Sequence, residues 1–240
     1  MPLQATAPLA ARRLTGELMD DPALDPAQHA AALRALARLN AFAGGHRILW
    51  PPLLALAAIP GHTALRILDV ATGSGDIPIR LMRLARRRGL HFTLDACDLS
   101  ETALDLARAR AARAGVDVNF FRHDALSASL PGEYDVVMCS LFLHHLHAED
   151  AVELLYRMRC AARRLVLVSD LVRSRAGLTL AWAASRLFTR SRIVHEDAVR
   201  SVRAAFTPDE LAELAASAGL EGAIIAPHWP QRMLMVWSRS

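Results

Sequence analysis

The stretch that decides the fold is an apolar run that passes into a glycine-containing turn: Ile67-Leu68-Asp69-Val70-Ala71-Thr72-Gly73-Ser74-Gly75-Asp76. The run that ends at Val70 predicts a buried strand, and the amphipathic residues 77–88 predict the helix that follows the turn. Glycine carries no Cβ, so ligand atoms can approach the backbone of such a turn closely. A turn of this kind also serves tight packing alone, and by itself it does not decide between the two explanations.

Outward from this turn, short apolar runs alternate with amphipathic helices. The runs are residues 66–70, 92–97, 118–121, 135–139 and 165–169, and the helices are residues 77–88, 100–114 and 149–162. A capping box at Thr207 and Glu210 starts a last helix, and two closing strands follow near residues 223–225 and 233–237. Strands separated by helices predict βαβ units. We therefore expect an α/β fold with a doubly wound, mostly parallel sheet of seven strands.

Two further segments flank this pattern. Residues 1–62 predict an N-terminal helical cap, with one helix starting at Asp25-Pro26-Ala27-Gln28 and another over residues 46–58. Residues 63–240 then form the main domain, in which residues 171–205 are a helical insert that we expect to cover the substrate side. The polar residues of interest in and beside the insert are Asp170, Arg173, His195, Asp197, Ser201 and Arg203.

Acidic and small residues stand where the predicted strands end. Asp98 follows the second strand, where a carboxylate can accept both ribose hydroxyls of a nucleoside, although it can also simply help Ser100 to start the next helix. Because parallel strands end at one edge of the sheet, the other candidates share that edge. They are Leu99 for the face of an adenine ring, Asp124 and Ala125 after the third strand, and Ser140 at the end of the fourth.

The turn also indicates which nucleoside is bound. A dinucleotide fingerprint requires a third glycine where this chain has Pro78, and Asp76 at the helix start would repel a diphosphate. A sulfonium ligand carries positive charge and no phosphate, so the pattern favours S-adenosylmethionine over NAD. An NAD(P)-dependent oxidoreductase and a non-catalytic cofactor-binding protein remain the alternatives.

The span from Asp69 to Leu146 resembles class I S-adenosylmethionine-dependent methyltransferases, and the sequence of its motifs is most similar to that of the ubiquinone/menaquinone C-methyltransferases. The turn and the segment Tyr134-Asp135-Val136-Val137-Met138-Cys139-Ser140, followed by Leu143-His144-His145-Leu146, carry the resemblance. Ala71 stands where many such enzymes have their first glycine. The resemblance implies the strand order 3-2-1-4-5-7-6. It also implies a cofactor site made of Asp69, Ala71, Thr72, Gly73, Ser74, Gly75, Asp98, Leu99, Asp124, Ala125 and Ser140.

Methyl transfer from a sulfonium is a direct displacement, and a phenol or acidic carbon acceptor must also lose a proton. The candidate catalytic residues are His144, His145 and His195, although the His pair can equally well cap and pack its turn. No metal site is predicted, because His144, His145 and His147 lie on one turn without carboxylate partners. The expected acceptor is a small, fairly apolar molecule, quinone-like or of a phenolic polyketide type, methylated on carbon or oxygen.

Composition supports a globular protein of a bacterial, GC-rich type. The 240 residues are 53% hydrophobic with a net charge of +4, and all 28 basic residues are arginines. Because the arginines are dispersed along the chain, nucleic-acid binding is not supported. The spacing of Cys97, Cys139 and Cys160 fits neither disulfides nor a metal, so we expect a cytoplasmic protein, monomer or homodimer. The apolar residues 178–188 suit a substrate wall, a peripheral membrane contact or a packed helix.

Overall fold

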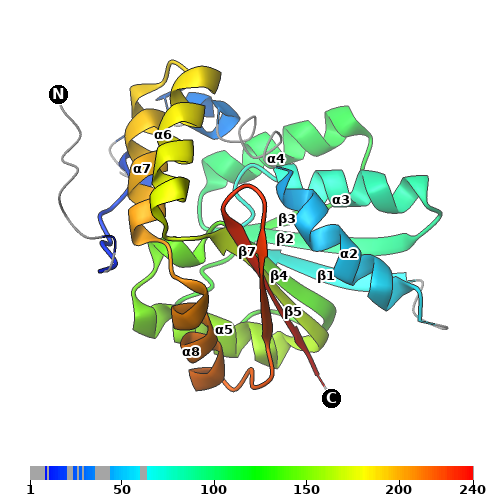
Figure 1. Ribbon diagram of the computed structural model, residues 1–240. Coiled ribbons are helices and arrows are strands. Elements are labelled where there is room, and N and C mark those ends of the chain that lie inside the picture. Colours follow the sequence, from blue (N-terminus) through cyan, green and yellow to red (C-terminus); the bar gives the residue numbers. More distant parts are fainter. Residues whose placement is uncertain are drawn as a thin grey trace.

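One sheet of seven strands organises the chain in the computed structural model, which describes residues 9, 11–20, 24–25, 27–28, 30–35, 44–59 and 64–239. The strands run in the order β3-β2-β1-β4-β5-β7-β6 (Figure 1). Their bounds are Ala64–Val70 (β1), His91–Asp98 (β2), Asn119–Arg122 (β3), Tyr134–Ser140 (β4), Ala162–Leu171 (β5), Ile224–His228 (β6) and Arg232–Ser238 (β7). Only β7 is antiparallel to its neighbours within this sheet. The predicted α/β class and strand order are therefore confirmed.

Helices cover both faces of the sheet (Figure 1). Helices α2 (Gly45–Ala57), α3 (Asp76–Arg87) and α4 (Glu101–Ala114) pack on one face, and α5 (Ala148–Ala161) and α8 (Pro208–Ser217) pack on the other. The central strands bury both of their faces, so alternate side chains enter opposite cores: Ile67 joins the α2–α4 side and Leu68 joins the α5–α8 side. A parallel sheet covered on both faces requires such continuous apolar strands, which is why the sequence pattern located them.

Most predicted element boundaries hold within one to three residues. The predicted capping box of α8 is present, because the Thr207 hydroxyl accepts a hydrogen bond from the Glu210 backbone N–H at 3.2 Å. The Thr207 backbone N–H in turn donates to the Glu210 carboxylate at 2.9 Å. Near the N-terminus the Asp25 carboxylate accepts from the backbone N–H groups of Ala27 and Gln28 at 3.0 Å, as the sequence predicts. Its predicted continuation through Leu36, Leu39 and Phe42 lies outside the described residues.

The insert after β5 is a pair of helices, α6 (Arg175–Phe188) and α7 (Arg192–Ala204), that pack against each other beside the carboxyl edge of the sheet (Figure 1). Two short 3-10 helices, η1 (Leu18–Asp20) and η2 (Leu143–His145), contact α7. The N-terminal segment follows α7 closely: the Arg13 backbone N–H donates to the Arg203 carbonyl at 3.0 Å. The N-terminal segment thus meets η2, about 130 residues later in the sequence, and the end of α7, about 190 residues later, at this edge of the sheet.

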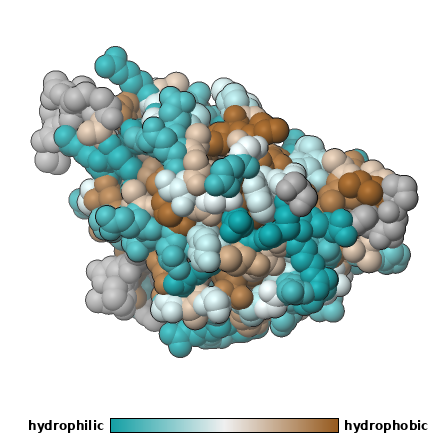
Figure 2. All heavy atoms as spheres, turned by 90° about the horizontal axis from the view of Figure 1, so that it is seen from below, coloured by the Kyte–Doolittle hydropathy of each residue, from teal (hydrophilic) through white to brown (hydrophobic). Residues whose placement is uncertain are grey.

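The described surface carries apolar residues in separate groups. On the face seen in Figure 2, hydrophobic side chains form patches between hydrophilic ones. Leu187 and Phe188 at the end of α6 are 78% and 40% exposed. No helix in the described part of the chain has the length and apolar character needed to cross a bilayer. Contact of the insert with a membrane surface stays a prediction.

Candidate functional site: a cavity at the carboxyl edge of the sheet

A cavity of about 980 Å³ lies at the carboxyl ends of the parallel strands, near the upper end of the range that small-molecule sites occupy. The described cofactor candidates line it, with the exception of Gly75. Helices α6 and α7 contribute small and apolar residues to the opposite wall: Gly177, Leu180, Ala181, Ala184, Ser185, Ala198, Ser201 and Val202. Helix α6 is therefore a cavity wall, not a helix that packs on the core, since only Gly177 and Ser185 are buried along its length.

The two glycines of the turn have different surroundings. Gly73 has a φ of +55°, and a Cβ added there would have no described atom within 4 Å. Gly75, the N-cap of α3, has a φ of +71°, and its added Cβ would lie 2.9 Å from the Ala107 Cβ and 3.0 Å from the Phe120 ring. Gly73 thus borders open space, whereas Gly75 allows α3 to approach α4 and β3. Ala71 shares the left-handed conformation at φ 55°, which glycine adopts at lower cost than alanine.

Asp98 connects the turn to the next helix. Its carboxylate accepts a hydrogen bond from the Gly73 backbone N–H at 2.7 Å and another from the Ser100 backbone N–H at 2.9 Å. Both explanations from the sequence therefore apply, because the side chain organises the start of α4 and also lines the cavity. Its place in the cavity lining makes this carboxylate a candidate acceptor for ligand hydroxyls.

Buried acidic groups form the floor of the cavity beneath the turn. Asp69 accepts a hydrogen bond from the Thr72 hydroxyl at 2.6 Å, and burial raises the pKa of Asp69 to about 7. Burial likewise raises the pKa of Asp76. One carboxylate oxygen of each, Oδ1 of Asp69 and Oδ2 of Asp76, is buried without a hydrogen-bond partner among the described residues. These two oxygens can accept hydrogen bonds from a ligand, and the guanidinium charges of Arg110, Arg80 and Arg232 act on Asp76.

The ends of β3 and β4 supply the remaining candidates. The Asp124 carboxylate accepts from the Ser127 hydroxyl and from the Leu126 backbone N–H at 3.0 Å, and these bonds lower the pKa of Asp124. Leu99 lines the cavity and is 56% exposed, so its side chain is accessible for contact with a flat ring. The Ser140 hydroxyl is buried without a partner among the described residues.

Two histidines of η2 lie at the far end of the cavity, where the insert covers it. His144 is 4% exposed, and its Nδ1 lies 2.6 Å from Oδ1 of Asp170 at the end of β5. The His144 backbone N–H also donates to Asp170 Oδ2 at 3.2 Å. Burial by itself would lower the pKa of His144, but the Asp170 charge and the hydrogen bonds to Asp170 and Glu17 raise it to about 10. The His145 ring lies 4.3 Å from the His144 ring, centroid to centroid.

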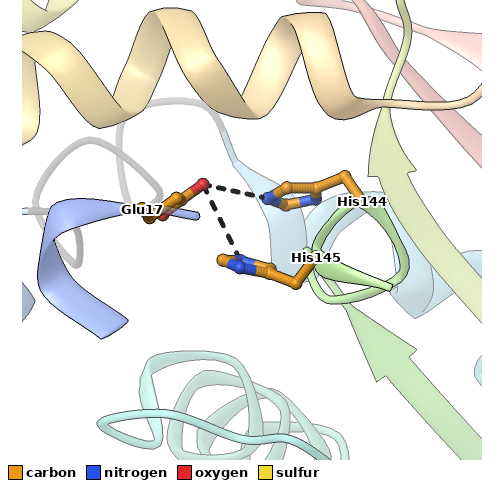
Figure 3. A group of neighbouring side chains, drawn as sticks. All are labelled: Glu17, His144 and His145. Carbon is orange, nitrogen blue, oxygen red and sulfur yellow. Dashed lines mark ion pairs between the residues drawn. The ribbon is translucent and has the colours of Figure 1, made fainter. Parts of the chain in front are cut away.

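Glu17 is the residue that the sequence did not reveal. Its Oε1 lies 3.7 Å from His144 Nε2 and 3.9 Å from His145 Nε2, so one carboxylate faces both rings (Figure 3). The expectation that these histidines lack carboxylate partners was therefore wrong. The segment around Glu17 has no periodic pattern and precedes the first predicted helix, so nothing in the sequence pointed to it.

Helix α7 holds the Glu17 segment in place. Asp197 accepts hydrogen bonds from the backbone N–H groups of Leu18 at 2.8 Å and Met19 at 3.1 Å. The Ser201 hydroxyl donates to the Glu17 carboxylate. Further along, the Arg12 guanidinium donates to the carbonyls of His144 at 3.0 Å and Leu146 at 2.6 Å. The polar residues of the insert thus bind the N-terminal segment.

His195 is not brought to this cluster. Its Nε2 lies 2.8 Å from the Thr189 carbonyl, between α6 and α7, and it is not among the described residues that line the cavity. Arg173 is also structural: its guanidinium bonds the Glu210 carboxylate at 2.6 Å and the Ala205 carbonyl at 2.8 Å.

Comparisons with known proteins give one consistent result. Residues 67–164 match a protein family described as a methyltransferase domain. The chain is 33% identical to a demethylmenaquinone methyltransferase of Thermus thermophilus over 105 residues, 43% of this chain and 46% of that protein. It is 31% identical to a ubiquinone biosynthesis O-methyltransferase of Bordetella parapertussis over 162 residues, 65% of this chain and 62% of that protein. The chain therefore spans less than two thirds of the length of both relatives.

Solved structures show the same fold. One is an O-methyltransferase from neocarzinostatin biosynthesis, in complex with S-adenosyl-L-homocysteine and 1,4-dihydroxy-2-naphthoic acid. It superposes with a TM-score of 0.65 at 19% identity, covering 90% of this chain and 59% of that one. At this identity the likeness concerns the architecture of the chain.

Proposed function

We propose that this chain is a class I S-adenosylmethionine-dependent methyltransferase and that it transfers the methyl group of that cofactor to a small, fairly apolar ring acceptor. The observation that carries the proposal is the two-part cavity. Acidic groups with unpartnered oxygens form the floor at the glycine turn, and apolar helices enclose the space beyond. A cationic sulfonium fits the first part, and an aromatic ring fits the second.

The cofactor would lie along the edge of the sheet. In our proposal its methionine end contacts the turn at Gly73, above Asp69, and its ribose hydroxyls donate to Asp98. Its adenine ring rests on Leu99 beside Asp124 and Ala125. Ser140, whose hydroxyl has no partner among the described residues, then lies near the transferable methyl group.

The reaction requires that the methyl donor and the acceptor are aligned and that one group accepts the acceptor's proton. S-adenosylmethionine, when bound, would supply the methyl group: the bond from the methyl carbon to sulfur would break with its electron pair staying on sulfur, while the bond to the acceptor oxygen or carbon would form. The acceptor proton leaves to a base, which we assign to His145 because its side chain is 22% exposed at the cavity. His144 is held by Asp170 and fixes the position of the neighbouring ring.

We infer the acceptor class from the side chains that α6 and α7 contribute to the cavity wall. Helices α6 and α7 present leucine, valine and alanine to the cavity, so a quinone-like or phenolic polyketide ring is favoured over a polar amine. The named relatives act in quinone biosynthesis, and one structural neighbour holds a dihydroxynaphthoic acid. These names support the same acceptor class for this chain.

Calorimetry tests the cofactor assignment. We expect S-adenosylhomocysteine to bind and NAD not to bind. The Asp98→Asn variant should bind S-adenosylhomocysteine about 10- to 100-fold more weakly, because a charge-assisted hydrogen bond is lost. Asp105→Asn is the matched control, since this carboxylate is on the outer face of α4 and pairs with Arg108. NAD binding in place of S-adenosylhomocysteine, or equal affinity of both variants, would refute the assignment.

The acceptor assignment is tested with radiolabelled S-adenosylmethionine and a panel of hydroxynaphthoic acids, alkylphenols and reduced quinones. We expect labelled product from ring acceptors and a fall in kcat of at least about 100-fold in His145→Gln, with KM little changed. His147→Gln, two residues away and exposed, should retain full activity. Transfer to polar amines but not to any ring acceptor would overturn the acceptor class and leave the cofactor assignment standing.

A further inference from the structure

Three potential metal ligands converge at the insert end of the cavity, and we propose that Glu17, His144 and His145 bind one divalent transition-metal ion of the Zn²⁺ type. One ligand atom from each residue lies within 4.8 Å of the other two (Figure 3). Among the residues that the structure describes, this is the one group of three with such geometry. The members come from η2 and from the segment before η1, so the fold assembles them.

The two distances from Glu17 are close to those that a tetrahedral ion requires. Ligand atoms bonded at about 2.1 Å around a tetrahedral ion are about 3.4 Å apart. Glu17 Oε1 lies 3.7 Å from His144 Nε2 and 3.9 Å from His145 Nε2. The two contacts of Glu17 therefore need a contraction of about 0.3–0.5 Å. The third separation, between the ligand nitrogens of His144 and His145, is at most 4.8 Å and closes through rotation of the half-buried His145 side chain.

The buried neighbour of His144 supports a metal-binding function in particular. Metal-ligating histidines usually donate their second ring N–H to a carboxylate, which fixes the tautomer and points the free nitrogen at the ion. Here Asp170 Oδ1 lies 2.6 Å from His144 Nδ1, and its other oxygen accepts the His144 backbone N–H at 3.2 Å. Both side chains are at most 5% exposed. His144 Nε2 is thereby directed at Glu17 and His145.

The donor set determines the class of ion. Imidazole and carboxylate ligands suit Zn²⁺, Co²⁺ and Fe²⁺, whereas Mg²⁺ and Ca²⁺ prefer oxygen ligands alone. Three protein ligands leave at least one open position, which is typical of catalytic ions and not of structural ones. All three residues line the cavity, so the open position faces the acceptor space.

A bound ion would change how the acceptor loses its proton, a consequence that rests on the proposed function. An acceptor hydroxyl that occupies the open position is polarised by the ion and loses its proton more readily. In the metal-bound protein, His145 therefore holds the ion and the hydroxyl proton passes to solvent water, whereas in the metal-free protein His145 takes the proton. An acceptor with two neighbouring ring oxygens gains most, because both can coordinate.

Metal binding is measured on the full chain without any acceptor. The background is Cys160→Ser, because Cys160 is an exposed thiol that would itself take up zinc. After treatment with a chelator and dialysis, ZnCl₂ is titrated by calorimetry and CoCl₂ by visible absorption. We expect one ion per chain with submicromolar affinity for Zn²⁺ and the absorption bands of low-coordinate Co²⁺.

Four variants locate the site. His145→Gln and Glu17→Gln should weaken Zn²⁺ binding at least 30-fold, and Asp170→Asn about 10- to 100-fold through the orientation of His144. His147→Gln is the matched control and should bind as the background does. Circular dichroism and S-adenosylhomocysteine affinity verify that each variant is folded.

Absence of stoichiometric binding would overturn the metal site, as would an equal loss of affinity in His147→Gln. Because S-adenosylhomocysteine binding is measured on the same samples, failure of the metal site and failure of the methyltransferase assignment give separate results.

Discussion

Of the two variants Gly73→Ala and Gly75→Ala, we expect one to lose more stability and the other to lose more ligand affinity. Both glycines have positive φ angles, of +55° and +71°, so alanine at either position costs about 1–2 kcal/mol of folding free energy. At Gly75 the new methyl group also lies 2.9 Å from Ala107 Cβ and 3.0 Å from the Phe120 ring. Overpacking of this kind adds about 1–3 kcal/mol. The Gly75→Ala variant should therefore be the less stable of the two.

Thermal unfolding gives the measurement. In a chain of this size, 1 kcal/mol changes Tm by about 2–4 °C, so Gly75→Ala should melt about 2–12 °C below Gly73→Ala. Titration calorimetry at low temperature, where both variants are folded, should show that Gly73→Ala loses more affinity for the ligand than Gly75→Ala does. Gly73→Ala projects a methyl group into the cavity and should weaken S-adenosylhomocysteine binding about 10-fold or more, which corresponds to about 1.4 kcal/mol. Gly75→Ala should bind nearly as wild type does, because its methyl group points away from the cavity.

Two outcomes would refute this reasoning. If the two variants melt at the same temperature, Gly75 does not serve the packing of α3 on α4 and β3. If Gly73→Ala retains the full affinity, the ligand does not approach the turn at this residue. Both results are obtained on the same protein samples, so a general loss of folding cannot be mistaken for either one.

Three further changes test other parts of the structure. Arg173→Met removes the charge-assisted hydrogen bonds to the partly exposed Glu210 carboxylate and should lower the free energy of unfolding by about 1–3 kcal/mol in a urea titration; an unchanged free energy of unfolding would contradict the structural assignment. His195→Gln removes the bond to the Thr189 carbonyl and should cost about 1 kcal/mol with methyl transfer unchanged, whereas a large fall in kcat would restore His195 as a catalytic candidate. The pKa of Asp69 is about 7 in the folded protein and near 4 in the unfolded chain, so the folded state retains this proton between those values. The Asp69 contribution to stability should therefore fall as pH rises from about 4 to about 7, and Asp69→Asn should flatten that part of the urea-stability profile.

The sheet was predictable because both of its faces are buried. Strands such as residues 66–70 and 135–139 must be apolar throughout, and that requirement is visible in a single sequence. The acidic edge was predictable for a related reason, since parallel strands deliver their last residues to one place. Asp69, Asp98 and Asp124 all line the cavity.

Other features depend on contacts between distant segments. The packing role of Gly75 requires Ala107 and Phe120, neither of which is recognisable as its neighbour from spacing. Glu17 lies in a stretch without periodicity, and it reaches His144 only because Asp197 and Ser201 hold its segment. His195 looked like a cavity residue because it stands beside two acidic residues in the insert, but its ring instead joins α6 to α7.

Because residues 12–19 are attached to α7, two different parts of the chain form the two ends of the cavity. The strand ends that carry the cofactor candidates belong to the α/β sheet itself. The other end of the cavity, at His144 and His145, is formed by residues 12–19 and by the helices of the insert, which hydrogen-bond to each other. Exchange of these two pieces as a matched pair would then alter which acceptor is methylated while the donor site is preserved. Exchange of one alone would break their mutual bonds, so we expect the two segments to diversify together.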